Sequence, residues 1–87
     1  EEMAFKAVAR RNKLVGLWAA ELLGKSSDEA TEYAKSVVLA DFEEAGSEDV
    51  VRKLVADLGS KADADTIRAK LDEFMSVAKG QLISEFK

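Results

Sequence analysis

The longest periodic run in the chain, residues 4–23, most constrains the fold. At about 100° per residue, one side of this run is apolar, as in an amphipathic helix. That side is formed by Ala4, Val8, Val15, Trp18, Ala19 and Leu22. Arg11 falls in the middle of it, and a charged guanidinium there needs an anionic partner or a place where the stripe meets water. We therefore predict a long helix that places Trp18 in the centre of a helical bundle and carries one charge on its inner face.

Glycines and capping residues divide the chain into four helical segments. Each predicted stop is a glycine after a periodic run, namely Gly24, Gly46 and Gly59. Each predicted start has a capping residue, namely Ser26 (with Glu29 in a capping box), Ser47 and Asp63. The resulting helices span 1–23, 27–44, 48–58 and 64–85. Short links and the lack of a strand pattern predict a single all-α domain, residues 1–87, with an up-down-up-down four-helix bundle.

Helical spacing also predicts which side chains of the later segments face the core. In the third segment these are Val50, Val51, Leu54, Val55 and Leu58. In the fourth they are Ile67, Leu71, Phe74, Met75, Ala78 and Leu82. Gly80 weakens the end of the fourth helix, because glycine costs up to about 1 kcal/mol relative to alanine in a helix interior. We expect fraying from that point.

Composition excludes several classes of function. The 87 residues contain no Cys and no His, which removes the common zinc sites and the Ser–His and Cys–His nucleophile pairs. We expect no enzyme activity, no metal and no cofactor. Asp63 and Asp65 resemble a metal-binding pair, but acidic residues are favourable at a helix start and capping explains them better.

Net charge and hydropathy limit the partners. The chain carries a net charge of −4, divided as +2 over residues 1–25, −7 over 26–50 and +1 over 51–87. A nucleic-acid binder would show a net basic face, so we expect no nucleic acid. No apolar run reaches the ~20 residues that cross a bilayer. We expect a cytoplasmic protein that does not insert into the membrane and is a monomer when free.

The sequence around Gly24 offers one alternative site. Gly24, Lys25, Ser26 and Ser27 resemble the end of a phosphate-binding loop, but that motif needs a glycine where Ala19 stands and a preceding strand. A helix stop followed by a cap explains the residues better. A weaker possibility stays open: Lys25, Ser26 and Ser27 at the next helix start could bind an anion or a nucleotide, as in a small helical ligand sensor.

Opposite charges define a second candidate. In an antiparallel hairpin, Arg11 and Asp41 lie at nearly the same height, ~20–24 Å from the turn. Asp41 and Glu44 crowd the end of a helix, where the dipole disfavours anions. We predict an Arg11–Asp41 ion pair, which Glu44 could extend, over the alternative of solvated surface charges. Residues 1–7, with Met3, form either a projecting end that docks into a partner or a frayed terminus.

Several sequence blocks resemble one known family. Residues 9–14 (ARRNKL) continue into 16–20 (GLWAA), and further blocks lie at 33–35 (YAK), 40–44 (ADFEE) and 48–50 (EDV). Together these residues resemble the zeta-subunit ATPase-inhibitor family of bacterial F-type ATP synthases, over almost the whole chain.

The resemblance implies a small four-helix protein that binds the catalytic head of the ATP synthase and blocks ATP hydrolysis through its N-terminal region. Such a protein needs no catalytic residue. Family members carry a further charged stretch ahead of the position that matches Glu1, so we expect this chain to inhibit weakly by itself. We predict that the partner-binding residues of the chain are Phe5, Lys6, Arg10, Arg11 and Lys13.

Overall fold

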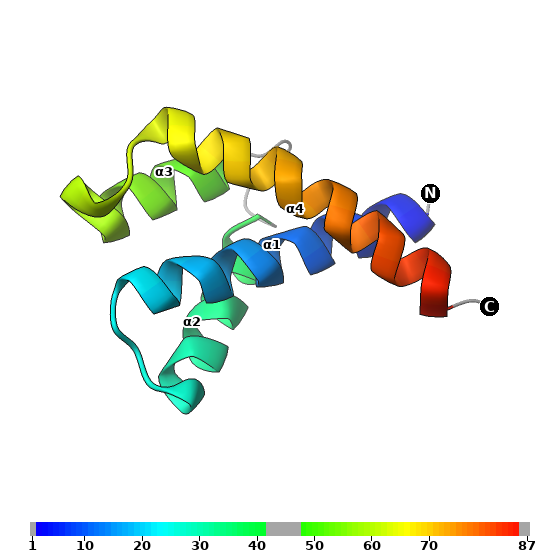
Figure 1. Cartoon of the computed structure of the whole chain (residues 1–87), viewed down its shortest axis with the longest axis horizontal. Coiled ribbons are helices and arrows are strands. Elements are labelled where there is room, and N and C mark those ends of the chain that lie inside the picture. Colours follow the sequence, from blue (N-terminus) through cyan, green and yellow to red (C-terminus); the bar gives the residue numbers. More distant parts are fainter. Residues whose placement is uncertain (1, 42–47, 86–87) are drawn as a thin grey trace.

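The computed structural model describes residues 2–41 and 48–85, which form four α-helices and one short 3-10 helix (Figure 1). These elements are α1 (Glu2–Leu22), α2 (Ser27–Ala40), α3 (Glu48–Leu58), η1 (Gly59–Lys61) and α4 (Ala64–Glu85). Successive helices run in alternating directions, so the start of α1 and the end of α4 lie at the same end of the molecule. The predicted all-α four-helix bundle is confirmed.

The helix boundaries follow the prediction closely except in α2. The bounds of α3 and α4 match, and α1 ends one residue early, at Leu22. The predicted second helix reached residue 44, but α2 ends at Ala40 with Asp41 as its C-cap. An anion is unfavourable at the negative end of the helix dipole, which gives a physical reason for the earlier end. Glu1, residues 42–44, Gly46 and Ser47 lie outside the described residues.

Local capping explains the tight link between α1 and α2. Gly24 adopts a φ of 73°, in the left-handed region that favours glycine. Ser26 and Glu29 form the predicted capping box: the Ser26 hydroxyl accepts from the Glu29 N–H at 3.4 Å, and the Ser26 N–H donates to the Glu29 carboxylate at 3.0 Å. Asp63 caps α4 in the same way, accepting from the Thr66 N–H at 2.8 Å. The sequence rules for helix ends therefore hold at these links.

Replacing Ser26 by alanine should reduce the free energy of unfolding by about 1 kcal/mol, because the first turn of α2 loses its side-chain acceptor. Ser27→Ala is the matched control. It removes the neighbouring exposed hydroxyl and should change stability by less than about 0.5 kcal/mol. Chemical denaturation of both variants measures the difference. Equal stability of the two variants would contradict a capping role for Ser26.

The core is a single cluster to which all four helices contribute. Its buried members are Val15, Ala19, Val37, Val50, Val51, Leu54, Leu58, Ile67 and Leu71. In α4 the predicted inner positions hold, with Ala78 and Leu82 also buried and Phe74 and Met75 half-buried. The fourth helix continues past Gly80 to Glu85, beyond the point where fraying was predicted.

Four predicted inner positions in α1 and α3 were wrong. Ala4, near the start of α1, is exposed. Leu22 is exposed because α1 ends there, and Leu23 packs against the core in its place. Val55 is exposed because it lies about 100° around α3 from Leu54, at the margin of the buried stripe. Trp18 is half-buried against the core instead of central, and the Lys70 ammonium lies 5.7 Å from its ring centre. Periodicity therefore identified the inner face of each helix but not its edges.

Gly16 marks a close approach of α1 and α2. A Cβ atom added at Gly16 would lie 2.8 Å from the Ala34 Cα and 3.2 Å from the Ala34 Cβ. Both residues are buried, so no side chain separates the two backbones at this point. Figure 1 shows that α1 and α2 cross one another. Small side chains at Gly16 and Ala34 therefore fix how the first two helices pack.

A polar contact ties α2 to α3 at the surface. The Tyr33 hydroxyl donates to the Asp57 carboxylate at 2.7 Å, and the Lys53 ammonium donates to the same oxygen at 3.0 Å. Burial raises the pKa of Tyr33, and the hydrogen bond to Asp57 raises it further. Burial raises the pKa of Asp57, but the hydrogen bonds from Tyr33 and Lys53 outweigh it and leave that pKa lowered. The Tyr33 hydroxyl therefore stays protonated and donating across the neutral range.

Candidate functional site

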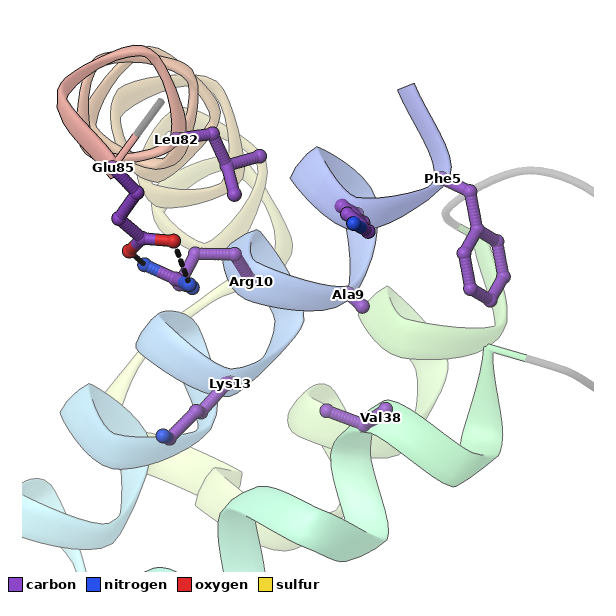
Figure 2. A pocket seen from close by; sticks show the side chains of 8 residues that line it. Phe5, Ala9, Arg10, Lys13, Val38, Leu82 and Glu85 are labelled. Carbon is purple, nitrogen blue, oxygen red and sulfur yellow. Dashed lines mark hydrogen bonds and ion pairs between the residues drawn. The ribbon is translucent and has the colours of Figure 1, made fainter. Parts of the chain in front are cut away.

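A hollow opens beside the N-terminal half of α1, between α1, the end of α2 and the last turns of α4 (Figure 2). Its volume is about 450 Å³. The apolar side chains that line it are Phe5, Ala9, Val38 and Leu82. The charged ones are Lys6, Arg10, Lys13 and Glu85. Of the residues that the structure describes, three cations and one carboxylate therefore surround the apolar side chains, in a chain whose net charge is −4.

The spacing of α1 places three cations around this hollow. Lys6, Arg10 and Lys13 lie at i, i+4 and i+7, which is one face of a helix. Phe5 lies next to Lys6 and is 57% exposed. An exposed aromatic ring beside cations is typical of a surface that binds a partner. The hollow therefore combines an apolar contact area with a positive rim.

Arg10 closes one side of the hollow by binding the end of α4. Its two terminal nitrogens donate to the two carboxylate oxygens of Glu85 at 2.7 and 3.1 Å, as the dashed lines of Figure 2 show. Arg10 also donates to the side-chain oxygen of Gln81 at 3.0 Å. Such bidentate pairs are the most specific ion-pair geometry in proteins. This contact holds α1 and α4 together at the end of the bundle where α1 begins and α4 finishes.

The Arg10–Glu85 pair should be visible in a pH titration. The hydrogen bond from Arg10 lowers the pKa of Glu85 below its ordinary value of 4.5. The folded pKa is lower than the unfolded one, so the stabilisation is fully present above the unfolded pKa and is lost as the pH falls through the folded value. We expect Arg10→Met to return the Glu85 pKa toward 4.5, as measured by NMR of the side-chain carboxyl carbon.

Asp63 is the control for this titration. Its pKa is lowered by the Thr66 backbone N–H, which does not involve Arg10. The pKa of Asp63 should therefore be the same in the Arg10→Met variant and in the wild type. A Glu85 pKa that does not change in the variant would contradict the ion pair in solution.

Arg11 lies apart from the hollow and is only 9% exposed. Its Nε and Nη2 atoms donate to the Asn12 side-chain oxygen at 3.0 and 2.9 Å, and Asn12 is itself buried. Burial lowers the pKa of Arg11, while the charges of Asp41 and Asp72 oppose that shift. Arg11 therefore lies among polar groups of three helices, with Asn12 as its hydrogen-bond partner.

The predicted Arg11–Asp41 pair is present only as two nearby charges. Within residues 2–41 and 48–85 the structure shows no direct hydrogen bond or ion pair between these two side chains. One buried oxygen of Asp41 and the buried side-chain nitrogen of Asn12 have no hydrogen-bond partner among the described residues. A direct contact between Arg11 and Asp41 stays a prediction, and Glu44 lies outside the described residues.

The structure thus brings together four of the five residues predicted to bind a partner. Phe5, Lys6, Arg10 and Lys13 line the hollow, whereas Arg11 packs inward. Sequence reasoning missed the contributions of α2 and α4, namely Val38, Leu82 and Glu85. A helical pattern shows which residues share a face, but not which other helix lies against that face. A dipole argument could have suggested Glu85, because an acid at the end of α4 is unfavourable without a cation nearby.

The predicted anion site at the start of α2 is surrounded by acidic side chains. Lys25 lies beside a hollow that Asp28, Glu29 and Glu32 also line. The Glu29 carboxylate already accepts from the Ser26 N–H, which takes the place that an anion would use. Anion binding by Lys25, Ser26 and Ser27 stays a prediction, and the charge around them argues against it.

Two classes of site have no counterpart in the described part of the chain. Across residues 2–41 and 48–85, no group of three or more acidic, His or Cys side chains could hold a metal ion. None of the described helices combines the length and the apolar character needed to span a bilayer.

The fold and the hollow together define a small all-α domain with a basic, partly apolar surface at one end. The ATPase inhibitor subunit zeta family matches residues 1–81. The chain belongs to this family, which confirms the predicted resemblance and supports an inhibitory role at the ATP synthase.

A solved structure agrees with this assignment. A protein whose structure was determined by solution NMR is 61% identical, with a TM-score of 0.88, and the match covers 95% of this chain and 98% of that chain. A search among curated proteins found no match.

Proposed function

We propose that this chain is an inhibitory regulator that binds the catalytic head of the F-type ATP synthase and restrains ATP hydrolysis through the N-terminal region of α1. Membership of the zeta family over residues 1–81 carries this proposal. The protein would act in the cytoplasm, where it associates with the membrane-bound enzyme, and would be a monomer when free. Inhibition of this kind needs a binding surface and no catalytic group.

The geometry of α1 supports the proposed direction of binding. Phe5 is exposed at the start of the helix, with Lys6 and Lys13 on the same hollow. Aromatic side chains dominate the energetics of many interfaces, and cations at the rim select acidic partners. The bundle would hold this end of α1 rigid, because Arg10 ties it to the end of α4.

The test is ATP hydrolysis by the isolated catalytic head with added full-length natural protein. We expect inhibition, and we expect Phe5→Ala to weaken it by about tenfold or more, since loss of an aromatic anchor commonly costs ~2 kcal/mol. Val55→Ala is the matched control, because Val55 is an exposed apolar side chain on α3. Unimpeded hydrolysis with the full-length natural protein would refute the proposal.

A further inference from the structure

A second hollow lies along the α1–α2 pair and adjoins the first. Its volume is about 320 Å³, and Lys13, Thr31, Ala34, Lys35, Val38 and Leu39 line it. Lys13 and Val38 line both hollows, so the two form one groove. We call this joint feature the α1–α2 groove. It extends from Phe5 on α1 to Thr31 on α2.

The helix crossing explains why the groove exists. The backbones of α1 and α2 approach closely at Gly16 and Ala34. The two helices cross in Figure 1, and crossing helices diverge away from their contact. Lys13 lies about one turn from Gly16, and Val38 lies about one turn from Ala34. Ala34 itself lines the second hollow, so the groove passes alongside this close contact.

The floor of the groove is apolar and accessible. Leu39 is 64% exposed, the largest exposed fraction among the large hydrophobic side chains of the described residues. Val38 lies next to it on α2 and lines both hollows, so the two side chains form an apolar strip along α2. Concentrated exposed apolar surface rimmed by polar residues marks interaction sites in soluble proteins.

The rim of the groove is basic. Among residues 2–41 and 48–85, the charged side chains that line it are Lys6, Arg10, Lys13, Lys35 and one carboxylate, Glu85. Glu85 is held by Arg10. Lys35 is bound to Glu32 at 3.3 Å, but both side chains are largely exposed and such a pair is weak. The groove therefore has the opposite sign to the whole chain and is complementary to an acidic partner.

The length of the groove sets the spacing of what it can hold. From Phe5 to Lys13 is eight residues of α1, or about 12 Å, and from Thr31 to Val38 is seven residues of α2, or about 10 Å. A helix lying in the groove would place two apolar side chains in the two hollows if they were seven residues apart. Flanking acidic residues on that helix would face the lysines.

We propose that the α1–α2 groove binds an acidic amphipathic helix of the ATP synthase catalytic head that presents two apolar side chains about two turns apart. This inference rests on the proposed function for the source of the partner. The groove is a second binding surface, in addition to the N-terminal end of α1. Binding at both surfaces fixes the orientation of the bundle on the enzyme. The occupant is recognised by apolar contact in the two hollows and by charge at the rim.

The first experiment measures the affinity of the full-length natural protein for the isolated catalytic head. The Lys13→Glu/Lys35→Glu variant should bind about tenfold more weakly and depend less on salt than the wild type, since rim charges act on association rate and salt dependence. Lys61→Glu is the matched control, because Lys61 is exposed on η1 and lies outside the residues that line either hollow. Thermal unfolding should show all these variants folded.

The second experiment identifies the occupant by photo-cross-linking. The chain has no natural cysteine, so Leu39→Cys can carry a single photoreactive maleimide, and Val55→Cys on α3 carries it in the control. With the head present, the label at position 39 should cross-link to an acidic helical segment of a head subunit. The label at position 55 should give little product at that segment.

The outcomes separate the two proposals. Absence of binding by the wild-type full-length protein overturns the proposed function, and the groove assignment with it. If the wild type binds while the Lys13→Glu/Lys35→Glu variant binds equally well, only the groove assignment is overturned. Cross-linking from position 39 to a second copy of this chain, or to a basic or non-helical segment of the head, also overturns it.

Discussion

Replacing Gly16 by valine should reduce the free energy of unfolding by about 3 kcal/mol. Overpacking a well-packed core typically costs 1–3 kcal/mol, and valine adds three carbons where the first of them would already lie 2.8 Å from the Ala34 backbone. The nearest obstacle is main chain and not a flexible side chain, so α1 and α2 must separate to admit it. Chemical denaturation monitored by circular dichroism measures the loss.

Gly80 provides a control of the same chemistry. It lies inside α4, but a Cβ added there meets no atom within 4 Å. Valine and glycine differ little in helix propensity, so Gly80→Val should change stability by less than about 0.5 kcal/mol. A comparable loss at both positions would show that helix propensity, and not the crossing of α1 and α2, decides the effect. The α1–α2 groove should also change shape in Gly16→Val, because Ala34, the residue that the new side chain would meet, lines it.

Replacing Arg11 by alanine should cost about 3 kcal/mol, the second large effect that we expect. The substitution leaves the buried Asn12 side chain without its hydrogen-bond donor and removes a long, mostly buried stem. An unsatisfied buried polar group costs about 1–3 kcal/mol, and the vacated volume adds to this. Equilibrium unfolding in urea measures the loss.

Arg68→Ala is the matched control for Arg11→Ala. Arg68 also pairs across helices, with Glu48 at 3.1 Å, but both partners are about half exposed. A surface pair of this kind is worth under about 1 kcal/mol. Equal losses in the two alanine variants would contradict a buried structural role for Arg11.

A double-mutant cycle with Asp41→Ala then examines the predicted Arg11–Asp41 pair. The described structure gives Asp41 a charge effect on Arg11 without a direct bond, so we expect a coupling free energy of about 1 kcal/mol or less. A coupling of about 3 kcal/mol or more would show that a direct buried pair forms in solution.

Local chemistry made the helix ends predictable. The glycine at Gly24, the capping box of Ser26 with Glu29, and the cap at Asp63 each act within a few residues, and the structure shows all three. The end of α2 was predicted too late, because the next glycine stop in the sequence is Gly46, whereas the helix ends at Ala40. Short-range rules therefore gave the number and order of the helices.

Contacts between helices were less predictable. Arg11 was recognised as a charge on an apolar face, but its partner was not, because adjacent residues on a helix do not normally face each other and Asn12 is the next residue. Gly16 was not recognised as a crossing point, although small residues follow it at Ala19 and Ala20. A single sequence shows that a residue is small, but not which backbone approaches it.

In the candidate site, too, the residues on one helix were predictable and those contributed by other helices were not. The cations Lys6, Arg10 and Lys13 were predicted from their positions on α1, and the structure places them on one hollow. Glu85 and Leu82 join that hollow only because α4 returns along α1, and that pairing depends on how the four helices pack together.

The antiparallel pairing of α1 and α4 also determines how the domain responds to mechanical force. Because the start of α1 and the end of α4 lie together, a pull applied to both ends would load the Arg10–Glu85 pair first. The contacts between the two helices would then break in sequence, one turn at a time, instead of all being loaded together in shear. A domain of this shape would yield gradually under tension from its ends, yet resist a load applied at the opposite end of the bundle.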